Sequence, residues 1–263
     1  MPTKSTVSSK RVQPRVTVIG SGTGVPSLSR GYPSILIRAE GEIMLLDTGP
    51  CTLARLLHRG VTYVDIDRVF YTHLHPDHSA GMTSMLFAMR NAEPKRTKPL
   101  RVFGPPGLKG FYEGLNQLYG NALTPKSYEL NLTELSEEET AFDGWKVRTS
   151  PMAHMVPTIG YRLEFSTGEV LAYSGDTDYC ENIVNLAKGA DVLVLECSFP
   201  EDLRVEGHLV PSLCARVARE SGCRRLVLNH FYPQWEGRDI LEECGRFYDG
   251  EIILAEDFVE LPL

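Results

Sequence analysis

The sequence predicts an α/β fold of four layers, in which two mixed sheets are covered on their outer faces by helices. Two observations support this class. Apolar segments of strand length recur along the whole chain, and segments with helical spacing lie between them, most regularly in the last third. No linker and no short-period repeat divides the 263 residues, so we expect a single domain over 15–263 behind a flexible, polar tail over 1–14.

In the first half, strands and helices alternate after an initial hairpin. We expect strands at 15–20, 34–38, 42–47, 68–72, 100–103 and 128–132, and helices at 52–58, from about 78 to 91 and from 108 to about 119. A glycine-rich turn over 21–26 follows the first strand. Its spacing matches neither a Walker loop nor a dinucleotide-binding fingerprint, so we assign its glycines to a tight turn.

The second half begins with strand-like alternation and ends with regular strand–helix units. We expect strands at 145–149, 160–165, 170–174, 191–196, 225–229 and 251–254, and helices at 211–220 and 238–245. The three consecutive glutamates at 137–139 are most simply a solvated turn.

The composition argues against several classes of protein. No apolar run reaches the length of a membrane span, and the polar N-terminal residues lack the apolar segment of a secretory signal. The six cysteines are scattered without a CxxC pair, so we expect reduced, mostly buried thiols in a cytoplasmic protein. The net charge of −7 argues against broad nucleic-acid binding, because phosphate contacts require clustered cations.

One basic stretch, 95–101, stands apart from this acidic balance. We interpret it as a solvated loop between a helix and a strand. The alternative is a patch that steers phosphate groups toward a neighbouring site.

Three of the seven histidines fall within six residues, in the run His73-Leu74-His75-Pro76-Asp77-His78. Imidazole and carboxylate groups suit Zn, Mn or Fe. Because the preceding residues form a predicted strand, His73 and His75 lie two apart in extended chain and point to one side. Pro76 forces a turn, after which Asp77 and His78 approach from the other side. The helix that begins near His78 has an N-terminal dipole that disfavours a protonated imidazole there, and a neutral imidazole is what a metal requires.

Three further side chains occupy similar positions. His154, Asp176 and His230 each follow an apolar strand at its carboxyl end, where sites tend to be built. Each is weak evidence alone, but their shared position beside the histidine run favours a joint metal site. His58 lies alone on its predicted helix and is assigned to the surface.

These residues resemble the metallo-β-lactamase superfamily. The run 73–78 matches its HxHxDH motif, and His154, Asp176 and His230 match its later ligands in order. Asp47 matches an early aspartate that usually braces the site rather than binding metal. The resemblance extends from about residue 16 to the C-terminus and implies the four-layer fold of that superfamily.

Within the superfamily the chain is similar to the ribonuclease Z group. The matching features are the opening loop 22–26 with Arg30, the turn 103–108, the segments 154–162 and 229–233, and the pair Glu196 and His208. Two features depart from members that mature tRNA. Such members usually carry a long arm, in one class between the third histidine ligand and the bridging aspartate, but only 21 residues separate His154 from Asp176 here. Leu209 also replaces the hydroxyl residue that often follows the catalytic histidine.

The resemblance implies a centre of two divalent ions about 3.5–4 Å apart, with Zn favoured over Mn and Fe. The expected ligands are His73, His75 and His154 for the first ion, Asp77, His78 and His230 for the second, and Asp176 as the bridge. A hydroxide between the ions, oriented by Asp77, is expected to attack phosphorus. His208 is expected to donate a proton or hydrogen bond to the leaving group, and Glu196 to fix the tautomer of that imidazole.

The favoured function is therefore a metal-dependent phosphodiesterase acting on a small-molecule or nucleotide ester, with neither RNA nor a membrane as the favoured partner. A homodimer is common in the resembled group. One alternative keeps the centre and changes the bond to an aryl sulfate, lactone or thioester. A second is a tRNA 3′-end processing endonuclease. A non-enzymatic nucleic-acid-binding protein is disfavoured, because the ligand set is intact and the charge is acidic.

Overall fold

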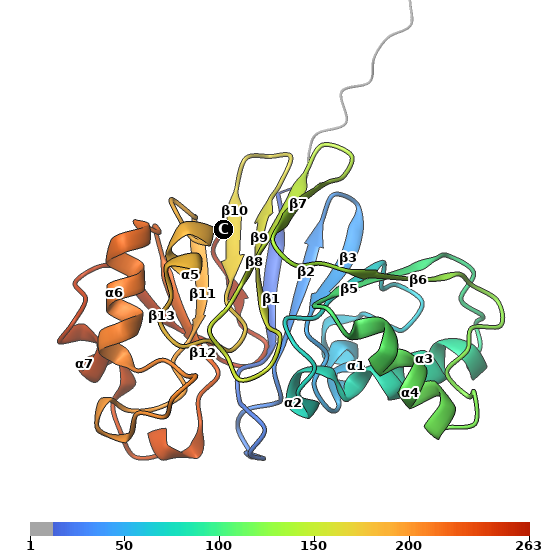
Figure 1. Cartoon of the computed structure of the whole chain (residues 1–263), viewed down its shortest axis with the longest axis horizontal. Coiled ribbons are helices and arrows are strands. Elements are labelled where there is room, and N and C mark those ends of the chain that lie inside the picture. The colour runs from blue at the N-terminus through green and yellow to red at the C-terminus, as the bar shows by residue number, and fades with distance from the viewer. Residues whose placement is uncertain (1–12) are drawn as a thin grey trace, which may run out of the picture.

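The computed structural model describes residues 13–263 and confirms the four-layer α/β class, with two sheets between outer helices (Figure 1). The tail expected over 1–14 lies outside the described residues, apart from residues 13 and 14.

Within the described residues, the first sheet has seven strands in the order β14-β1-β2-β3-β4-β5-β6. Their bounds are β1 Arg15–Gly20, β2 Ser34–Ala39, β3 Glu42–Leu46, β4 Arg68–Phe70, β5 Leu100–Gly104, β6 Leu130–Glu134 and β14 Glu260–Leu261. Strands β1 to β3 pair antiparallel, whereas β3 to β6 pair parallel. The carboxyl ends of β3 and β4 therefore lie at one edge of this sheet.

The second sheet also has seven strands within 13–263, in the order β13-β12-β11-β10-β9-β8-β7. Their bounds are β7 Glu138–Ala141, β8 Lys146–Pro151, β9 Ile159–Glu164, β10 Val170–Tyr173, β11 Val192–Glu196, β12 Leu226–Asn229 and β13 Ile252–Leu254. Strands β8 to β10 pair antiparallel and β10 to β13 pair parallel. Because β8, β10, β11 and β12 run in the same direction, the loops that follow them gather at one edge.

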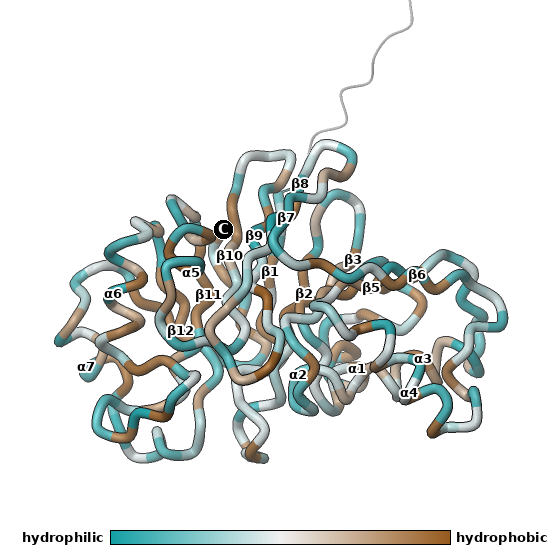
Figure 2. The backbone as a smooth tube through the Cα atoms, in the orientation of Figure 1, coloured by the Kyte–Doolittle hydropathy of each residue, from teal (hydrophilic) through white to brown (hydrophobic). Residues whose placement is uncertain are grey.

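Three hydrophobic clusters separate the four layers. The first lies between the sheets and includes Val18, Phe70, Tyr161 and Val194. The second packs α5 (Glu181–Leu186), α6 (Pro211–Ser221) and α7 (Ile240–Gly245) on the second sheet. The third packs α1 (Thr52–Leu56), α3 (Gly81–Asn91) and α4 (Leu108–Leu118) on the first sheet. Figure 2 shows hydrophobic residues along β1 and β10, whereas β7 and β8 near the edge of the second sheet are largely hydrophilic.

Several expected elements differ from the structure. The glutamates at 137–139 were expected in a turn, and this is wrong for Glu138 and Glu139, which begin β7 and pair with β8 at the sheet edge. The helix expected from about 78 is two helices, α2 (Pro76–Ser79) and α3, with Ala80 between them. The strand expected at 128–132 lies at 130–134. Helix α5 and strand β14 were not predicted, because segments of six and two residues carry little periodicity.

The glycine-rich turn does not depend on left-handed backbone, since Gly20, Gly22 and Gly24 do not have positive φ. Close packing explains Gly20 better. A Cβ at Gly20 would lie 1.9 Å from the carbonyl oxygen of Tyr32. Within the turn, a Cβ at Gly22 would lie 3.0 Å from the Cβ of Arg30 and from the carbonyl oxygen of Gly31, so close packing rather than left-handed backbone accounts for this glycine.

The basic stretch 95–101 is the expected loop leading from α3 into β5, but Arg96 is buried rather than solvated, and the stretch does not lie beside the histidine run as the phosphate-patch alternative requires. The Arg96 side chain is buried and donates to the carbonyl oxygens of Tyr63, Val64 and Pro99. Lys98 pairs with Asp67 at 2.7 Å. The stretch lies just before β5, at the amino ends of the parallel strands, whereas the histidine run follows the carboxyl end of β4.

The expectations for the cysteines and for His58 agree with the structure. The six cysteines are free thiols and four of them are buried. His58 is exposed in a short 3-10 helix, η1 (Leu57–Arg59). Among residues 13–263, no helix has the length and apolar character needed to cross a bilayer.

Candidate metal centre

The seven expected ligands come together at one edge of the two sheets, at the carboxyl ends of four strands. His73 and His75 follow β4, and α2 carries Asp77 and His78. His154, Asp176 and His230 follow β8, β10 and β12, respectively. Segments up to 157 residues apart in sequence therefore meet because equivalent strand ends share an edge.

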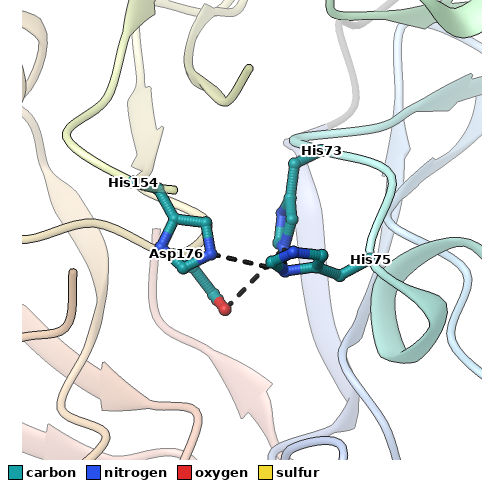
Figure 3. Close-up of side chains that lie close together, drawn as sticks. All are labelled: His73, His75, His154 and Asp176. Carbon is teal, nitrogen blue, oxygen red and sulfur yellow. Dashed lines mark hydrogen bonds and ion pairs between the residues drawn. The ribbon is translucent and has the colours of Figure 1, made fainter. Parts of the chain in front are cut away.

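One group of ligand atoms comes from His73, His75, His154 and Asp176, whose side chains point toward one another (Figure 3). His75 Nδ1 lies 3.0 Å from His73 Nε2 and 3.3 Å from His154 Nε2. Asp176 Oδ2 lies 3.8 Å from His73 Nε2. Three imidazole nitrogens and one carboxylate oxygen thus surround a common point.

A second group comes from Asp77, His78 and His230. Nε2 of His78 lies 3.3 Å from Nε2 of His230, and Asp77 Oδ2 lies 3.8 and 3.6 Å from these two nitrogens. Asp176 Oδ1 is 3.2 Å from His78 Nε2 and 3.4 Å from His230 Nε2. The two oxygens of Asp176 therefore face different groups, as a bridging carboxylate requires.

The donor set fits divalent metal ions. Ligands about 2.0–2.2 Å from one tetrahedral ion are separated from each other by roughly 3.4 Å, and the observed N···N separations of 3.0–3.3 Å approach this value. Asp176 Oδ1 is buried and accepts no hydrogen bond within residues 13–263. A buried carboxylate oxygen without a hydrogen-bond donor, facing two imidazoles, is the environment that a cation satisfies.

The electrostatics of the centre differ between the histidines. Burial and the imidazole of His78 hold the pKa of His73 well below its usual range. Burial also opposes protonation of His78, but the carboxylates of Asp176 and Asp47 outweigh it and raise the pKa of His78 well above its usual value. The expectation that the helix dipole governs His78 is therefore wrong, because two carboxylates face this ring and α2 has only four residues. A cation held by His78 and Asp176 would supply the positive charge that these carboxylates otherwise draw onto the imidazole.

A family model described as a beta-lactamase superfamily domain matches residues 43–231, which include all seven ligands. The chain belongs to the β-lactamase superfamily. The resemblance inferred from the histidine run is thereby confirmed.

Several ribonuclease Z proteins resemble this superfamily member over nearly their full length. The chain is 26% identical to ribonuclease Z of Archaeoglobus fulgidus over 309 positions, covering 95% of this chain and 97% of that one. It is 28% identical to ribonuclease Z of Bacillus cereus, covering 93% of this chain and 98% of that one.

Solved structures agree with this placement in the superfamily. The short form of human tRNase Z superposes with a TM-score of 0.75 at 25% identity, covering 94% of this chain and 98% of that one. The metallo-beta-lactamase fold protein YhfI of Bacillus subtilis gives a TM-score of 0.80 at 21% identity, with coverages of 94% and 98%. A diphosphatase of the PhnP family gives 0.74 at 20% identity, with coverages of 95% and 98%.

Asp47 contacts one of the expected ligands but belongs to neither group of ligand atoms. Its carboxylate is buried and lies 2.8 Å from His78 Nδ1. It also accepts hydrogen bonds from the backbone N–H of Thr72 at 2.8 Å and the hydroxyl of Tyr173 at 3.0 Å. This contact fixes the tautomer of His78, so that Nε2 faces the other ligands, and the bracing role expected for Asp47 agrees with the geometry.

Replacing Asp47 by asparagine is expected to weaken metal affinity by about 10–100-fold, because the neutral amide removes the carboxylate that orients His78. Competition with a chromogenic chelator measures the affinity. Asp67→Asn is the matched control, since Asp67 accepts a backbone hydrogen bond from Ile43 but lies at the opposite edge of the sheet. Equal affinities for the two variants would contradict the assigned role.

Glu196 and His208 form a pair beside the ligands. His208 Nδ1 lies 3.0 Å from Glu196 Oε1, and a ring nitrogen of His208 lies within 4.8 Å of ligand atoms of Asp176 and His230. Burial lowers the pKa of His208, but the hydrogen bond and charge of Glu196 outweigh it and raise the pKa to about 9. The Glu196 carboxylate therefore favours the protonated form of His208.

Sequence reasoning missed two groups that hold the ligands. Ser198 Oγ lies 2.9 Å from His230 Nδ1 and also donates to Glu196, so it joins Glu196 to a ligand. The carbonyl oxygen of Gly207 accepts from His154 Nδ1 at 3.0 Å. The position of Ser198, two residues after Glu196 at a strand end, could have identified it. A backbone carbonyl such as that of Gly207 leaves no trace in the sequence.

Proposed function

We propose that this chain is a dinuclear, metal-dependent phosphodiesterase, with Zn favoured over Mn and Fe. The observation that carries the proposal is the convergence of seven imidazole and carboxylate side chains on two adjoining groups of ligand atoms that share Asp176. Its relatives support the choice of bond, because they are named as ribonuclease Z and tRNase Z.

In this proposal, His73, His75 and His154 hold one ion, Asp77, His78 and His230 hold the other, and Asp176 contacts both. Divalent ions in such a pair acidify bound water and offset charge on a phosphoryl group. The protein must then orient the attacking water and protonate the leaving oxygen. Asp77 is suited to orient the attacking water. Its Oδ2 is not held by a single hydrogen-bond partner, and it lies beside the second group of ligand atoms, 3.6 Å from His230 Nε2.

His208 is suited to protonate the leaving oxygen. Glu196 engages Nδ1, which leaves Nε2 to donate its proton toward the substrate. The backbone N–H groups of Thr177 and Leu209 also donate to Glu196, at 2.6 and 3.2 Å, so the carboxylate that holds His208 is itself fixed. As the ester bond breaks, the proton moves from Nε2 to the alkoxide, and the imidazole becomes neutral.

A tRNA precursor is a poor fit to this chain. The residues between His154 and Asp176 are occupied by β9 and β10, which leaves no arm at that position. The match to the A. fulgidus ribonuclease Z extends over 309 positions, more than the 263 residues of this chain, so that relative has segments without a counterpart here. The net charge of −7 also disfavours a polyanion. A small ester is therefore the proposed substrate, and the homodimer and the cytoplasmic location stay predictions.

A substrate panel combined with elemental analysis tests this function. We expect about two equivalents of divalent metal and turnover of bis(4-nitrophenyl) phosphate that is lost on chelation and restored by Zn, Mn or Fe. The expected kcat/KM for the phosphodiester exceeds that for 4-nitrophenyl sulfate, an aryl lactone and a tRNA precursor by at least about tenfold. Unchanged turnover by metal-stripped protein would contradict the proposal. A higher kcat/KM for the sulfate or the lactone would show that the enzyme hydrolyses that ester rather than a phosphodiester.

A further inference from the structure

A cavity of about 220 Å³ lies between the loop after β1 and the segment that follows His230. Its lining includes Arg30 on one side and Phe231, Tyr232, Trp235 and Ile240 on the other. Figure 1 shows the loop after β1 at the same lower edge of the molecule as the loops after β11. We call this space the aromatic cavity. It shares the edge of the sheets on which the metal ligands lie.

The lining of the aromatic cavity is mixed, because its aromatic and aliphatic side chains lie beside Ser27, Ser29, Glu236 and Arg238. Phe231, Trp235 and Ile240 are buried. Trp235 is fixed by a hydrogen bond of 2.9 Å from its indole N–H to the carbonyl oxygen of Cys197. The Arg30 guanidinium lies 4.5 Å from the centroid of the Phe231 ring, so its flat face adds to this surface. Such a lining favours a flat ring.

The charges around the aromatic cavity are compensated. Arg30 donates to Ser21 Oγ and to the carbonyl oxygen of Ala255, and Asp257 contributes a nearby carboxylate. Arg238 forms two hydrogen bonds with the carboxylate of Asp202. Glu236 adds a negative charge to the lining. A second phosphate would find no unengaged cation among these side chains, and so an uncharged group fits better.

Tyr232 connects the aromatic cavity to the candidate metal centre. Its ring stacks on Phe199 with a centroid separation of 4.6 Å. Its edges meet the rings of His208 and His230 at 6.0 and 5.7 Å. The same residue that lines the cavity therefore touches both a metal ligand and the proposed proton donor, which places the cavity on the leaving-group side.

We propose that the aromatic cavity binds an uncharged aromatic ring of the leaving alcohol, and that Tyr232 is the specificity-determining residue that holds this ring. The inference rests on the proposed phosphodiesterase function and names its substrate class. The volume suits one ring system, because pockets for larger ligands usually exceed about 300 Å³. An aryl alcohol and a nucleoside both supply such a ring.

A binding measurement tests the cavity without turnover. The chain has two tryptophans, and Trp145 lies before β8, at the end remote from His154. In the metal-loaded Trp145→Phe variant, Trp235 is the sole indole. We expect 4-nitrobenzylphosphonate, which cannot be hydrolysed at its carbon–phosphorus bond, to quench Trp235 saturably, and methylphosphonate to leave the emission unchanged. If phenylphosphonate displaces 4-nitrobenzylphosphonate and thymidine 3′-monophosphate does not, the cavity binds the ring of an aryl alcohol. If both compounds displace it equally, the cavity binds a nucleobase.

Two variants of Tyr232 test its role in turnover. We expect Tyr232→Ala to raise KM about tenfold for both bis(4-nitrophenyl) phosphate and methyl 4-nitrophenyl phosphate, which share one leaving group. Tyr232→Phe keeps the ring and is expected to leave KM within about twofold. Elemental analysis of each variant is expected to show unchanged metal.

Three outcomes would overturn the cavity assignment. The first is hydrolysis of the aryl esters without quenching of Trp235, and the second is an unchanged KM in Tyr232→Ala. The third is a raised KM for the bis ester only, because the ring in the cavity would then belong to the group that stays on phosphorus. Failure of the proposed function looks different, since no diester would be hydrolysed by the wild-type protein whatever the fluorescence reports.

Discussion

Replacing Asp176 by alanine is expected to remove bound metal and to lower turnover of a phosphodiester by at least about 10³-fold. Asp176 is the single carboxylate shared by the two groups of ligand atoms, with Oδ2 facing His73 and Oδ1 facing His78 and His230. Its loss leaves a cluster of imidazoles without the negative charge that offsets bound cations. Burial raises the pKa of Asp176, but His230 and His78 outweigh it and hold the pKa well below its usual range, so the carboxylate is ionised in the native protein.

Metal content by elemental analysis and initial rates with bis(4-nitrophenyl) phosphate measure this effect. Asp143→Ala is the matched control, since Asp143 is exposed between β7 and β8 and the same substitution there is expected to change neither quantity. A circular dichroism spectrum like that of the wild type separates loss of the centre from loss of the fold. Full metal retention by Asp176→Ala would show that the shared carboxylate is not a ligand.

His208→Ala is expected to lower kcat by about 10²–10⁴-fold while leaving the metal content unchanged. The proposed role of His208 is to protonate the leaving oxygen, and Glu196 holds the ring at 3.0 Å for that purpose. The effect falls on kcat because the proton is transferred as the bond breaks. It is expected to be smaller for 4-nitrophenyl esters than for alkyl esters, since a good leaving group needs less protonation.

His58→Ala provides the matched control for this variant, because His58 is an exposed histidine that packs on Phe258 with a centroid separation of 5.1 Å. We expect its rates and metal content to equal those of the wild type. Loss of metal in His208→Ala would contradict the proton-donor role and make His208 a ligand instead, a role that its position near Asp176 and His230 also permits.

The fold class and the convergence of the seven expected ligands were accessible from the sequence for one shared reason. Strands buried between layers appear as short apolar runs, and parallel strands place their carboxyl ends at one edge. A liganding residue directly after such a run, as with Asp176 after β10 and His230 after β12, is thereby assigned to that edge before any coordinates are known. The dense run at 73–78 supplied the starting point.

Other features depend on tertiary contacts that sequence patterns do not encode. Arg96 is basic and was expected in solvent, yet its hydrogen bonds to three backbone carbonyl oxygens offset the free-energy cost of burying its charge. Glu138 and Glu139 disfavour a strand by composition, but an edge strand tolerates charged side chains because one side of it faces solvent. The raised pKa of His78 follows from two carboxylates that are 31 and 98 residues away in sequence, so a local helix-dipole argument could not predict it.

Anomalous diffraction from crystals of the metal-loaded protein, recorded on both sides of the zinc absorption edge, would locate the bound ions. We expect two separate peaks. One lies among His73, His75 and His154, the other lies among Asp77, His78 and His230, and Asp176 contacts both. A single peak elsewhere in the molecule, or metal bound while these seven side chains keep their metal-free contacts, would contradict it.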